Sequence, residues 1–198
     1  MPDDPIQETI ATYDAAAAAF ADRTCGLDLE AQLARLAARL GLGARVLDVG
    51  CGKGAFTARL KENFPAYRIT GVDIAPTAIK KARQEYGHLG IEFITLDVRE
   101  YQNMADRAGK DFGLVVMSDI MWYVLPEFEK MVRYLDRIIA KGGWLLISQS
   151  FCQPEEQKYG SDIVSSPQEM MRLIPYRVVE MIEANRFSNH HAVILYQV

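Results

Sequence analysis

A run of alternating glycines stands between a strand pattern and a helix pattern, and it constrains the fold more than any other feature. The segment reads VLDVGCGKGAF over residues 46–56. Glycine tolerates positive φ and lets the backbone approach a ligand closely, and the first turn of the following helix offers N–H groups without intrahelical partners. The segment predicts a tight strand-to-helix turn that binds a ligand. A turn that binds nothing is the simpler alternative.

Short aliphatic runs alternate with helical patterns along most of the chain. The expected strands are Arg45–Val49, Tyr67–Val72, Ile91–Leu96, Phe112–Met117 and Trp144–Ser148. The expected helices are about 28–41, 55–64, 77–86, 99–108 and 127–140, the last with Phe128, Met131, Leu135, Ile138 and Ile139 on one face. This alternation predicts βαβ units with right-handed crossovers, and therefore a doubly wound, mostly parallel α/β sheet.

The C-terminal part of the chain breaks this alternation. Tyr176–Ile182 and Ala192–Val198 both have strand patterns, and the polar loop between them leaves no room for a helix. Two strands joined in this way must be antiparallel. We therefore expect one domain over residues 1–198, whose sheet ends in an antiparallel hairpin.

Composition excludes several classes of protein. The 198 residues are 49% hydrophobic, which is too many for intrinsic disorder. The excess of 26 acidic over 22 basic residues argues against nucleic acid or an anionic membrane as the partner. The N-terminus has no signal-peptide pattern, no apolar run is long enough for a membrane span, and three scattered cysteines suit neither disulfides nor a metal. A cytoplasmic protein of undetermined oligomeric state is expected.

The glycine run also satisfies the G-x-G-x-x-G/A fingerprint of dinucleotide binding, so an NAD(P)-dependent oxidoreductase is the main alternative. Asp48 lies two residues before the first glycine. A carboxylate there would repel a pyrophosphate and favour a cationic ligand group. A P-loop is excluded because no G-K-[ST] follows at the required spacing. A module that binds a cofactor without catalysis is a third possibility.

An acidic residue accompanies the end of each of the first four expected strands. These residues are Asp48, Asp73, Asp97 and Asp119. Ligands of open parallel sheets bind outside the carboxyl ends of the strands, and an acid after the second strand is the expected partner of ribose hydroxyls. Each acid alone could cap a helix or form a turn. Four in register indicate a binding cleft.

The motifs VLDVGCGKG, GVDIAP, FITLDV, SDIMWYV and GGWLLIS, in this order, resemble the class I S-adenosylmethionine-dependent methyltransferases. The resemblance runs from about residue 28 to the C-terminus, and it implies a seven-stranded Rossmann-like sheet with S-adenosylmethionine as cofactor. SDIMWYV followed by a helix is similar to small-molecule methyltransferases of the nodulation protein S type, which methylate a sugar amine. The resemblance thus implies methyl transfer to nitrogen or oxygen of a small polar acceptor, such as an amino sugar or a hydroxylated metabolite.

The same resemblance implies a set of cofactor-binding residues. They are Asp48, Gly50, Cys51, Gly52, Asp73, Ile74, Asp97, Val98 and Ser118. Asp48 and the loop backbone would face the methionine part of the cofactor, and the backbone carbonyl of Ser118 would approach its amino group. Asp73 would bind the ribose hydroxyls. Ile74 would pack on the adenine, while Asp97 and the backbone N–H of Val98 would bind its edge.

The acceptor side needs few catalytic groups, because the sulfonium methyl is already activated and the enzyme mainly aligns the acceptor. The candidate catalytic residues are Asp119, Tyr123, His190 and His191. The first two follow the fourth strand, and the two histidines begin the last strand, which starts at the ligand edge if the hairpin's first strand is parallel to the others. The structural alternatives are helix capping for Asp119, packing for Tyr123 and solvated imidazoles for the histidines.

Two segments are expected to cover the site. Residues 1–26 form an Ala-rich arm, and residues 151–170 lack periodicity as lids do. The expected contact residues of these segments are Tyr13, Phe20, Arg23, Tyr159, Asp162 and Ser165.

Overall fold

The computed structural model describes residues 36–151, 164–186 and 189–198. The strands are β1 (Arg45–Val49), β2 (Arg68–Asp73), β3 (Glu92–Thr95), β4 (Phe112–Ser118), β5 (Ile139–Phe151), β6 (Arg177–Arg186) and β7 (Asn189–Gln197). The α-helices are α3 (Ala55–Asn63), α4 (Pro76–Tyr86), α5 (Met104–Arg107), α6 (Met121–Val124), α7 (Phe128–Leu135) and α8 (Pro167–Leu173). Short 3-10 turns are η1 (Gly87–Leu89), η2 (Tyr101–Asn103) and η3 (Leu125–Glu127).

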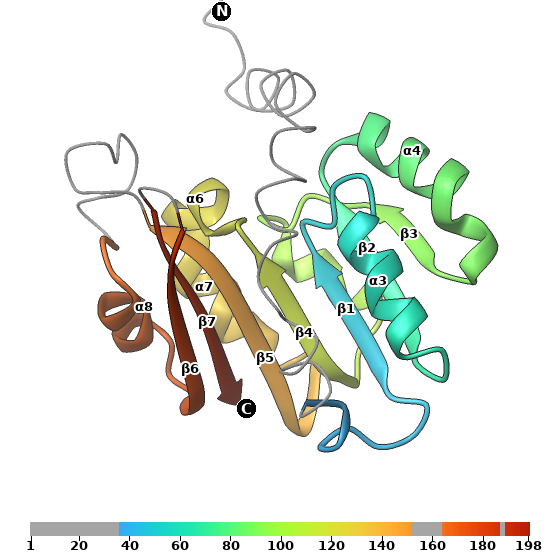
Figure 1. The fold of residues 1–198 in the computed structure, drawn as a ribbon. Helices are drawn as coiled ribbons and strands as arrows, with labels where there is room; N and C mark the ends of the chain where they lie inside the picture. The colour runs from blue at the N-terminus through green and yellow to red at the C-terminus, as the bar shows by residue number, and fades with distance from the viewer. Residues whose placement is uncertain (1–35, 152–163, 187–188) are drawn as a thin grey trace, which may run out of the picture.

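These strands form one sheet in the order β3-β2-β1-β4-β5-β7-β6 (Figure 1). The strands from β1 to β5 pair in parallel, whereas β7 is antiparallel to both β5 and β6. It follows that β6 runs parallel to the first five strands. The predicted doubly wound, mostly parallel α/β sheet with a C-terminal antiparallel hairpin is confirmed.

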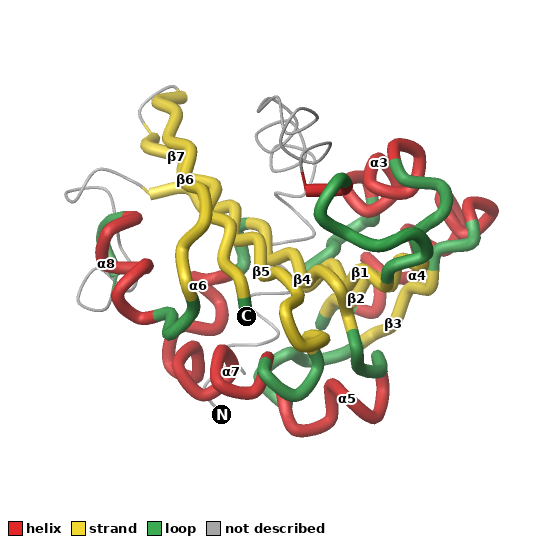
Figure 2. The backbone as a smooth tube through the Cα atoms, turned by 90° about the horizontal axis from the view of Figure 1, so that it is seen from below, coloured by secondary structure: helices red, strands yellow, loops and turns green. Residues whose placement is uncertain are grey.

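Helices cover both faces of the sheet (Figure 2). In β1, Val46 packs in a cluster with Leu60 of α3 and Ala82 of α4, whereas the next residue, Leu47, packs in a cluster with Met131 of α7. Successive strand residues point to opposite faces, so both clusters draw on every central strand. Buried apolar side chains fill both faces, and polar chemistry is left to the carboxyl edge of the parallel strands.

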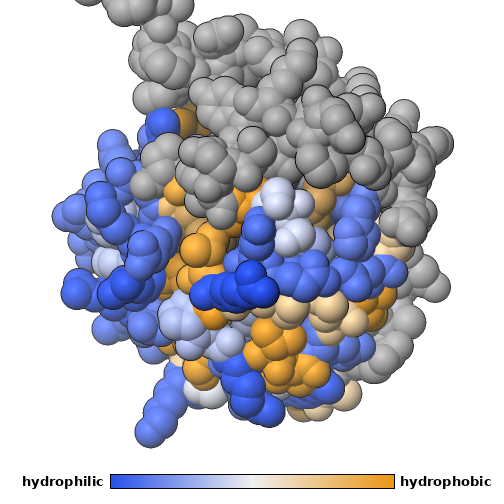
Figure 3. Space-filling view, turned by 90° about the vertical axis from the view of Figure 1, so that its left-hand side faces the viewer, coloured by the Kyte–Doolittle hydropathy of each residue, from blue (hydrophilic) through white to orange (hydrophobic). Residues whose placement is uncertain are grey.

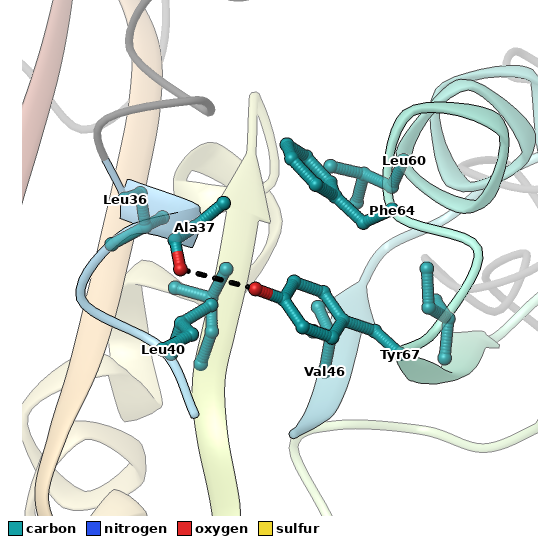
Figure 4. Close-up of a pocket in the computed structure, with 9 residues that line it drawn as sticks. Leu36, Ala37, Leu40, Val46, Leu60, Phe64 and Tyr67 are labelled. Carbon is teal, nitrogen blue, oxygen red and sulfur yellow. Dashed lines mark hydrogen bonds between the residues drawn. The ribbon is translucent and has the colours of Figure 1, made fainter. Parts of the chain in front are cut away.

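A small apolar pocket lies on the α3 face of the sheet (Figure 4). Leu36, Leu60 and Phe64 are among the side chains that line it. The hydroxyl of Tyr67 donates to the backbone carbonyl of Ala37 at 3.1 Å. Its lining has no charged side chain, so the pocket belongs to packing and not to chemistry.

The helix expected over 127–140 is wrong in its second half. The α7 helix ends at Leu135, where the N–H of Ile138 bonds to the carbonyl of Leu135 at 3.0 Å and tightens the turn. The N–H of Phe112 then bonds to the carbonyl of Ile138 at 2.9 Å, and Ile139 pairs with Phe112 as the start of β5. Both isoleucines are buried as the helix pattern requires, but they reach the core from a turn and a strand.

Other boundaries also differ from the expected ones. The helix expected over 99–108 is replaced by η2 and the four-residue α5. The hydrogen bond from the N–H of Asn103 to the carbonyl of Glu100, at 2.8 Å, has 3-10 spacing and interrupts a regular helix. Of the helix expected over 28–41, only residues from Leu36 onward are described, and among them Leu36 and Ala37 are helical.

The β6 strand forms one end of the sheet beside α8. The space-filling view of this side shows hydrophobic side chains between hydrophilic ones (Figure 3), and Val178 of β6 is 38% exposed. In the part of the chain that the structure describes, no helix has both the length and the hydrophobicity to cross a membrane.

Candidate active site

The four predicted acids lie along the carboxyl edge of the parallel strands, at the top of the sheet in Figure 1. Asp73 is the last residue of β2, and Asp48 pairs with Gly71 one position before the end of β1. Asp119 follows β4 directly, and Asp97 lies two residues beyond β3. The parallel topology therefore gathers these acids as the sequence predicts.

The glycine loop between β1 and α3 has the strained backbone that its sequence requires. Gly50, Gly52 and Gly54 have φ values of 77°, 54° and 85°, in the left-handed region that glycine tolerates. A Cβ on Gly50 would lie 2.0 Å from Cγ2 of Ile120, so this glycine also permits a close approach between the loop and the segment after β4. The loop is thus packed closely against the segment after β4 at the carboxyl edge.

Asp73 connects this loop to the beginning of α4. Its carboxylate accepts the N–H of Gly52 at 2.8 Å and the N–H of Ala75 at 2.9 Å. Burial raises the pKa of Asp73, although these two hydrogen bonds lower it in part. The carboxylate keeps further lone pairs for a ligand's hydroxyl groups, because two ionised oxygens accept about four hydrogen bonds.

Asp48 is more deeply buried, at 2% exposure, and accepts the hydroxyl of Thr57 at 2.6 Å. The pKa of Asp48 is raised to about 7, mainly by burial and also by the charge of Asp73. The hydrogen bond from Thr57 lowers this pKa in part. Within residues 36–151, 164–186 and 189–198, no ion pair includes Asp48, Asp73 or Asp119. A cationic ligand group would relieve the cost of ionising them.

Asp97 has a charged partner that sequence reasoning missed. Its carboxylate accepts from the guanidinium of Arg99, with Nε at 2.9 Å from Oδ1 and a terminal nitrogen at 2.6 Å from Oδ2. Burial raises the pKa of Asp97, but the hydrogen bonds and charge of Arg99 outweigh it and hold the pKa below its ordinary value. Ile74 and Val98, the predicted walls of an adenine pocket, are both half-buried.

Asp119 does not cap the helix that follows it. Its backbone has a φ of 50°, and its carboxylate accepts the N–H of Ser150 in β5 at 2.8 Å. The N–H of Met121 at the start of α6 donates instead to Oε1 of Gln149 at 3.3 Å. The capping alternative for Asp119 is therefore wrong, because this side chain connects β4 to β5.

The two histidines have different surroundings, because neighbouring residues of a strand point to opposite faces. His191 is 6% exposed, with Nε2 at 2.9 Å from Oγ of Ser148 and Nδ1 at 2.8 Å from Oγ of Ser150. His190 is half-exposed, and its Nε2 lies 3.2 Å from a carboxylate oxygen of Glu183. The solvated alternative is wrong for His191, which is buried and whose charge lowers the pKa of Asp119.

Three further candidate groups surround this cluster. Burial raises the pKa of Asp119, and the charge of His191 lowers it in part. Tyr123 is 43% exposed, and its pKa is raised by burial and by the charges of Asp119 and Asp73. Ser118 ends β4 beside Ser148 of β5. Tyr123 therefore packs with part of its side chain and exposes the rest to solvent.

Sequence reasoning overlooked Ser148, Gln149 and Ser150. The signal was present, because these polar residues interrupt the apolar strand pattern at the end of β5. Ser165, an expected lid contact, donates its hydroxyl to Glu169 of α8 at 2.8 Å. The other expected contacts of the arm and the lid lie outside the described residues: Tyr13, Phe20, Arg23, Tyr159 and Asp162.

Residues 46–143 match a family model described as a methyltransferase domain. Carboxy-S-adenosyl-L-methionine synthase of Chromohalobacter salexigens is 30% identical over 128 residues, which are 60% of this chain and 44% of that protein. Nodulation protein S of Bradyrhizobium diazoefficiens is 29% identical over 140 residues, which are 68% of this chain and 64% of that protein. The chain thus spans less than two thirds of either relative.

The structural comparison reaches further along the chain. The crystal structure of the N-methyltransferase NodS from Bradyrhizobium japonicum WM9, in complex with S-adenosyl-L-homocysteine, has a TM-score of 0.68. The two sequences are 20% identical, and the match covers 88% of this chain and 90% of the NodS chain. Fold and site together define the Rossmann-like methyltransferase class. This chain carries a methyltransferase domain over residues 46–143, resembles the class I S-adenosylmethionine-dependent methyltransferases and is similar in fold to NodS.

Proposed function

We propose that the protein is a cytoplasmic enzyme that transfers the methyl group of S-adenosylmethionine to nitrogen or oxygen of a small polar acceptor, such as an amino sugar or a hydroxylated metabolite. The observation that carries this proposal is the group of buried carboxylates around the glycine loop. Asp48 and Asp73 lie close enough for the charge of Asp73 to raise the pKa of Asp48. A ligand with an ammonium group, a sulfonium group and two ribose hydroxyls complements this arrangement.

The residues present fit the cofactor part by part. Asp48 and the positive-φ backbone at Gly50 and Gly52 would hold its methionine part, because glycine adopts this backbone without strain and has no side chain between its N–H and a ligand. Cys51 contributes backbone to the same loop, and its thiol is buried. The carbonyl of Ser118, at the end of β4, would accept from the methionine amino group.

The adenosine part would lie toward β2 and β3. Asp73 would accept the ribose hydroxyls, and the half-buried side chains of Ile74 and Val98 would enclose the adenine. Asp97 would bind the adenine amino group only with the oxygen lone pairs that Arg99 does not use. When bound, the cofactor supplies an activated methyl group, so these residues need only hold and orient it.

The acceptor side would be built by the residues beyond β4 and β5. Asp119 and Tyr123 line the carboxyl edge, and His191 lies behind them in contact with two serine hydroxyls. His190 would take a smaller part, since it pairs with Glu183 on the opposite face. The acceptor would be polar, because Asp119, Tyr123 and Ser150 bring a carboxylate and two hydroxyl groups to this edge.

The relatives include both acceptor types without deciding between them. NodS is an N-methyltransferase, and a relative from Mycolicibacterium smegmatis, 26% identical over 145 residues, is a fatty-acid O-methyltransferase. The matched relatives and structures provide no support for the NAD(P)-dependent oxidoreductase alternative. Asp48 argues against it too, because its carboxylate stands at the point where that class binds a pyrophosphate.

Calorimetry of the full chain tests the proposal directly. S-adenosylhomocysteine should bind with micromolar affinity, and NADH should not bind at the same concentrations. The methyl group of radiolabelled S-adenosylmethionine should then appear on an amino sugar or a hydroxylated metabolite in a panel. Binding of NADH without binding of S-adenosylhomocysteine would contradict the proposal.

A further inference from the structure

A chain of hydroxyl and imidazole groups leads from the carboxyl edge into the sheet. Ser150 of β5 is half-buried, whereas His191 of β7 and Ser148 of β5 are 6% and 4% exposed. The strand register places Ser150 opposite His191, and both ring nitrogens of His191 lie within hydrogen-bond distance of a serine hydroxyl. Of these three hydrogen-bonded side chains, Ser150 is therefore the one that an acceptor can reach.

Resting on the proposed function, we infer that the acceptor's reacting group is a hydroxyl and that its proton passes through Ser150 to His191. A neutral imidazole donates from one ring nitrogen and accepts at the other, while each serine hydroxyl can do both. If Nε2 of His191 donates to Ser148, then Nδ1 is left to accept the proton from Ser150. In the tautomer with its proton on Nε2, Ser148 accepts that hydrogen bond and holds the ring, so it is a positioning residue and Nδ1 is unprotonated.

Asp119 completes the arrangement from the neighbouring strand. Its carboxylate accepts the backbone N–H of Ser150 at 2.8 Å, the residue whose hydroxyl meets the imidazole. The electrostatic attraction between Asp119 and His191 favours a protonated ring. The carboxylate of Asp119 therefore holds Ser150 in place and stabilises the positive charge that forms on His191.

The proton balance explains why this arrangement suits a hydroxyl. As the hydroxyl oxygen forms its bond to the methyl group, its proton passes to Oγ of Ser150, and the proton of Ser150 passes to Nδ1 of His191. The electron pair of the broken methyl bond stays on sulfur, so the positive charge lost there reappears on the imidazolium beside Asp119. A neutral amine reacts through its own lone pair and loses its proton to water afterwards, so it needs no buried base.

The protonation state of His191 tests the relay without any acceptor. Long-range ¹⁵N–¹H spectra of the full chain, with S-adenosylhomocysteine added, should show one neutral tautomer at pH 8 with the proton on Nε2. A His191→Gln protein assigns the signals, and a Ser148→Ala protein should show a mixture of tautomers. A doubly protonated ring at pH 8, or a parent ring protonated on Nδ1, overturns the inference, because that nitrogen could not accept a proton.

Kinetics test the acceptor class with glucosamine and N-acetylglucosamine, which share hydroxyls and differ in the free amine. The parent should form O-methyl products, identified by mass spectrometry. Ser150→Ala should lower kcat on the order of 100-fold, as expected for loss of general-base catalysis, and leave KM and the affinity for S-adenosylhomocysteine within about 3-fold. Ser150→Thr should restore most of kcat, and His88→Gln, an exposed histidine in η1, should match the parent.

Two outcomes separate this inference from the function on which it rests. A parent protein that binds S-adenosylhomocysteine but forms only N-methylglucosamine overturns the relay and leaves the proposed methyltransferase intact. A parent protein that does not bind S-adenosylhomocysteine contradicts the proposed function itself. Full activity of Ser150→Ala toward the hydroxyl acceptor also overturns the relay, whatever the cofactor affinity.

Discussion

The backbone N–H of Gly52 donates to Oδ2 of Asp73 across 2.8 Å, which connects the glycine loop after β1 to the end of β2. The other oxygen of the same carboxylate accepts the N–H of Ala75 at the start of α4. One buried charge therefore fixes two loops at the carboxyl edge. Its loss should affect both the shape of the loop and the ligand that the loop binds.

The first prediction concerns this carboxylate. Asp73→Ala should weaken the binding of S-adenosylhomocysteine about 10- to 100-fold, because hydrogen bonds to a charged group contribute about 1.5–3 kcal/mol. Asp73→Asn should lose less, since its amide oxygen still accepts one backbone N–H. Glu85→Ala, an exposed acid on α4, is the control and should bind as the parent does. Equal dissociation constants for Asp73→Ala and the parent would remove Asp73 from the binding site.

The second prediction concerns the close approach at Gly50. Gly50→Ala should lower the free energy of unfolding by about 2–4 kcal/mol, because the φ of 77° is unfavourable for alanine and its Cβ would lie 2.0 Å from Ile120. Gly87→Ala, with a φ of −59° and no atom within 4 Å of the added Cβ, should be nearly neutral.

Urea denaturation of both variants measures this difference. A double variant, Gly50→Ala with Ile120→Ala, removes the clashing methyl group and should lose less stability than the two single changes together. If the losses of stability in the two single variants add up to that of the double variant, the crowding at Ile120 does not contribute to the cost of Gly50→Ala.

The third prediction concerns the pH dependence of stability. The pKa of Asp48 is 3.8 ordinarily and about 7 in the folded protein, so between these values the folded state holds a proton that the unfolded chain has lost. The free energy of unfolding should therefore fall as the pH rises from about 4 to about 7, by at most about 4 kcal/mol from this residue.

Asp48→Asn cannot titrate at this position and still accepts from Thr57. Its stability should exceed that of the parent by a margin that grows toward pH 7 and is constant above it. Urea denaturation at pH 4.5, 6 and 7.5 measures the margin. Parallel pH profiles for the two proteins would show that Asp48 is ionised throughout.

The fourth prediction concerns Gln149, which is buried at the end of β5. Its amide accepts the N–H of Met121 and donates to the carbonyl of Ser150. Gln149→Leu should leave both groups unsatisfied and cost about 1–3 kcal/mol of stability, whereas Gln168→Leu on the exposed side of α8 should cost little. Thermal unfolding distinguishes them, and equal melting temperatures would refute a structural role for the Gln149 amide.

Local sequence patterns were sufficient for much of the fold. The glycine run, the alternation of strand and helix patterns and the loop too short for a helix predict the sheet and its antiparallel hairpin, because each depends on residues close together in the chain. The acids at the strand ends follow from the same reasoning, since parallel topology brings all carboxyl ends to one edge. The end of α7 at Leu135 could not be predicted, because a buried stripe looks alike in a helix, a turn and a strand.

The sequence by itself determined the class of fold and the edge at which the site lies. Only the tertiary structure decided which polar groups meet there. Ser148 and His191 are 43 positions apart, and their hydrogen bond depends on the register of β5 against β7, which no local pattern specifies. Packing on both faces of the sheet also buries Ser148 and His191. A polar group without access to water needs a hydrogen-bond partner within the protein, so these side chains depend on one another.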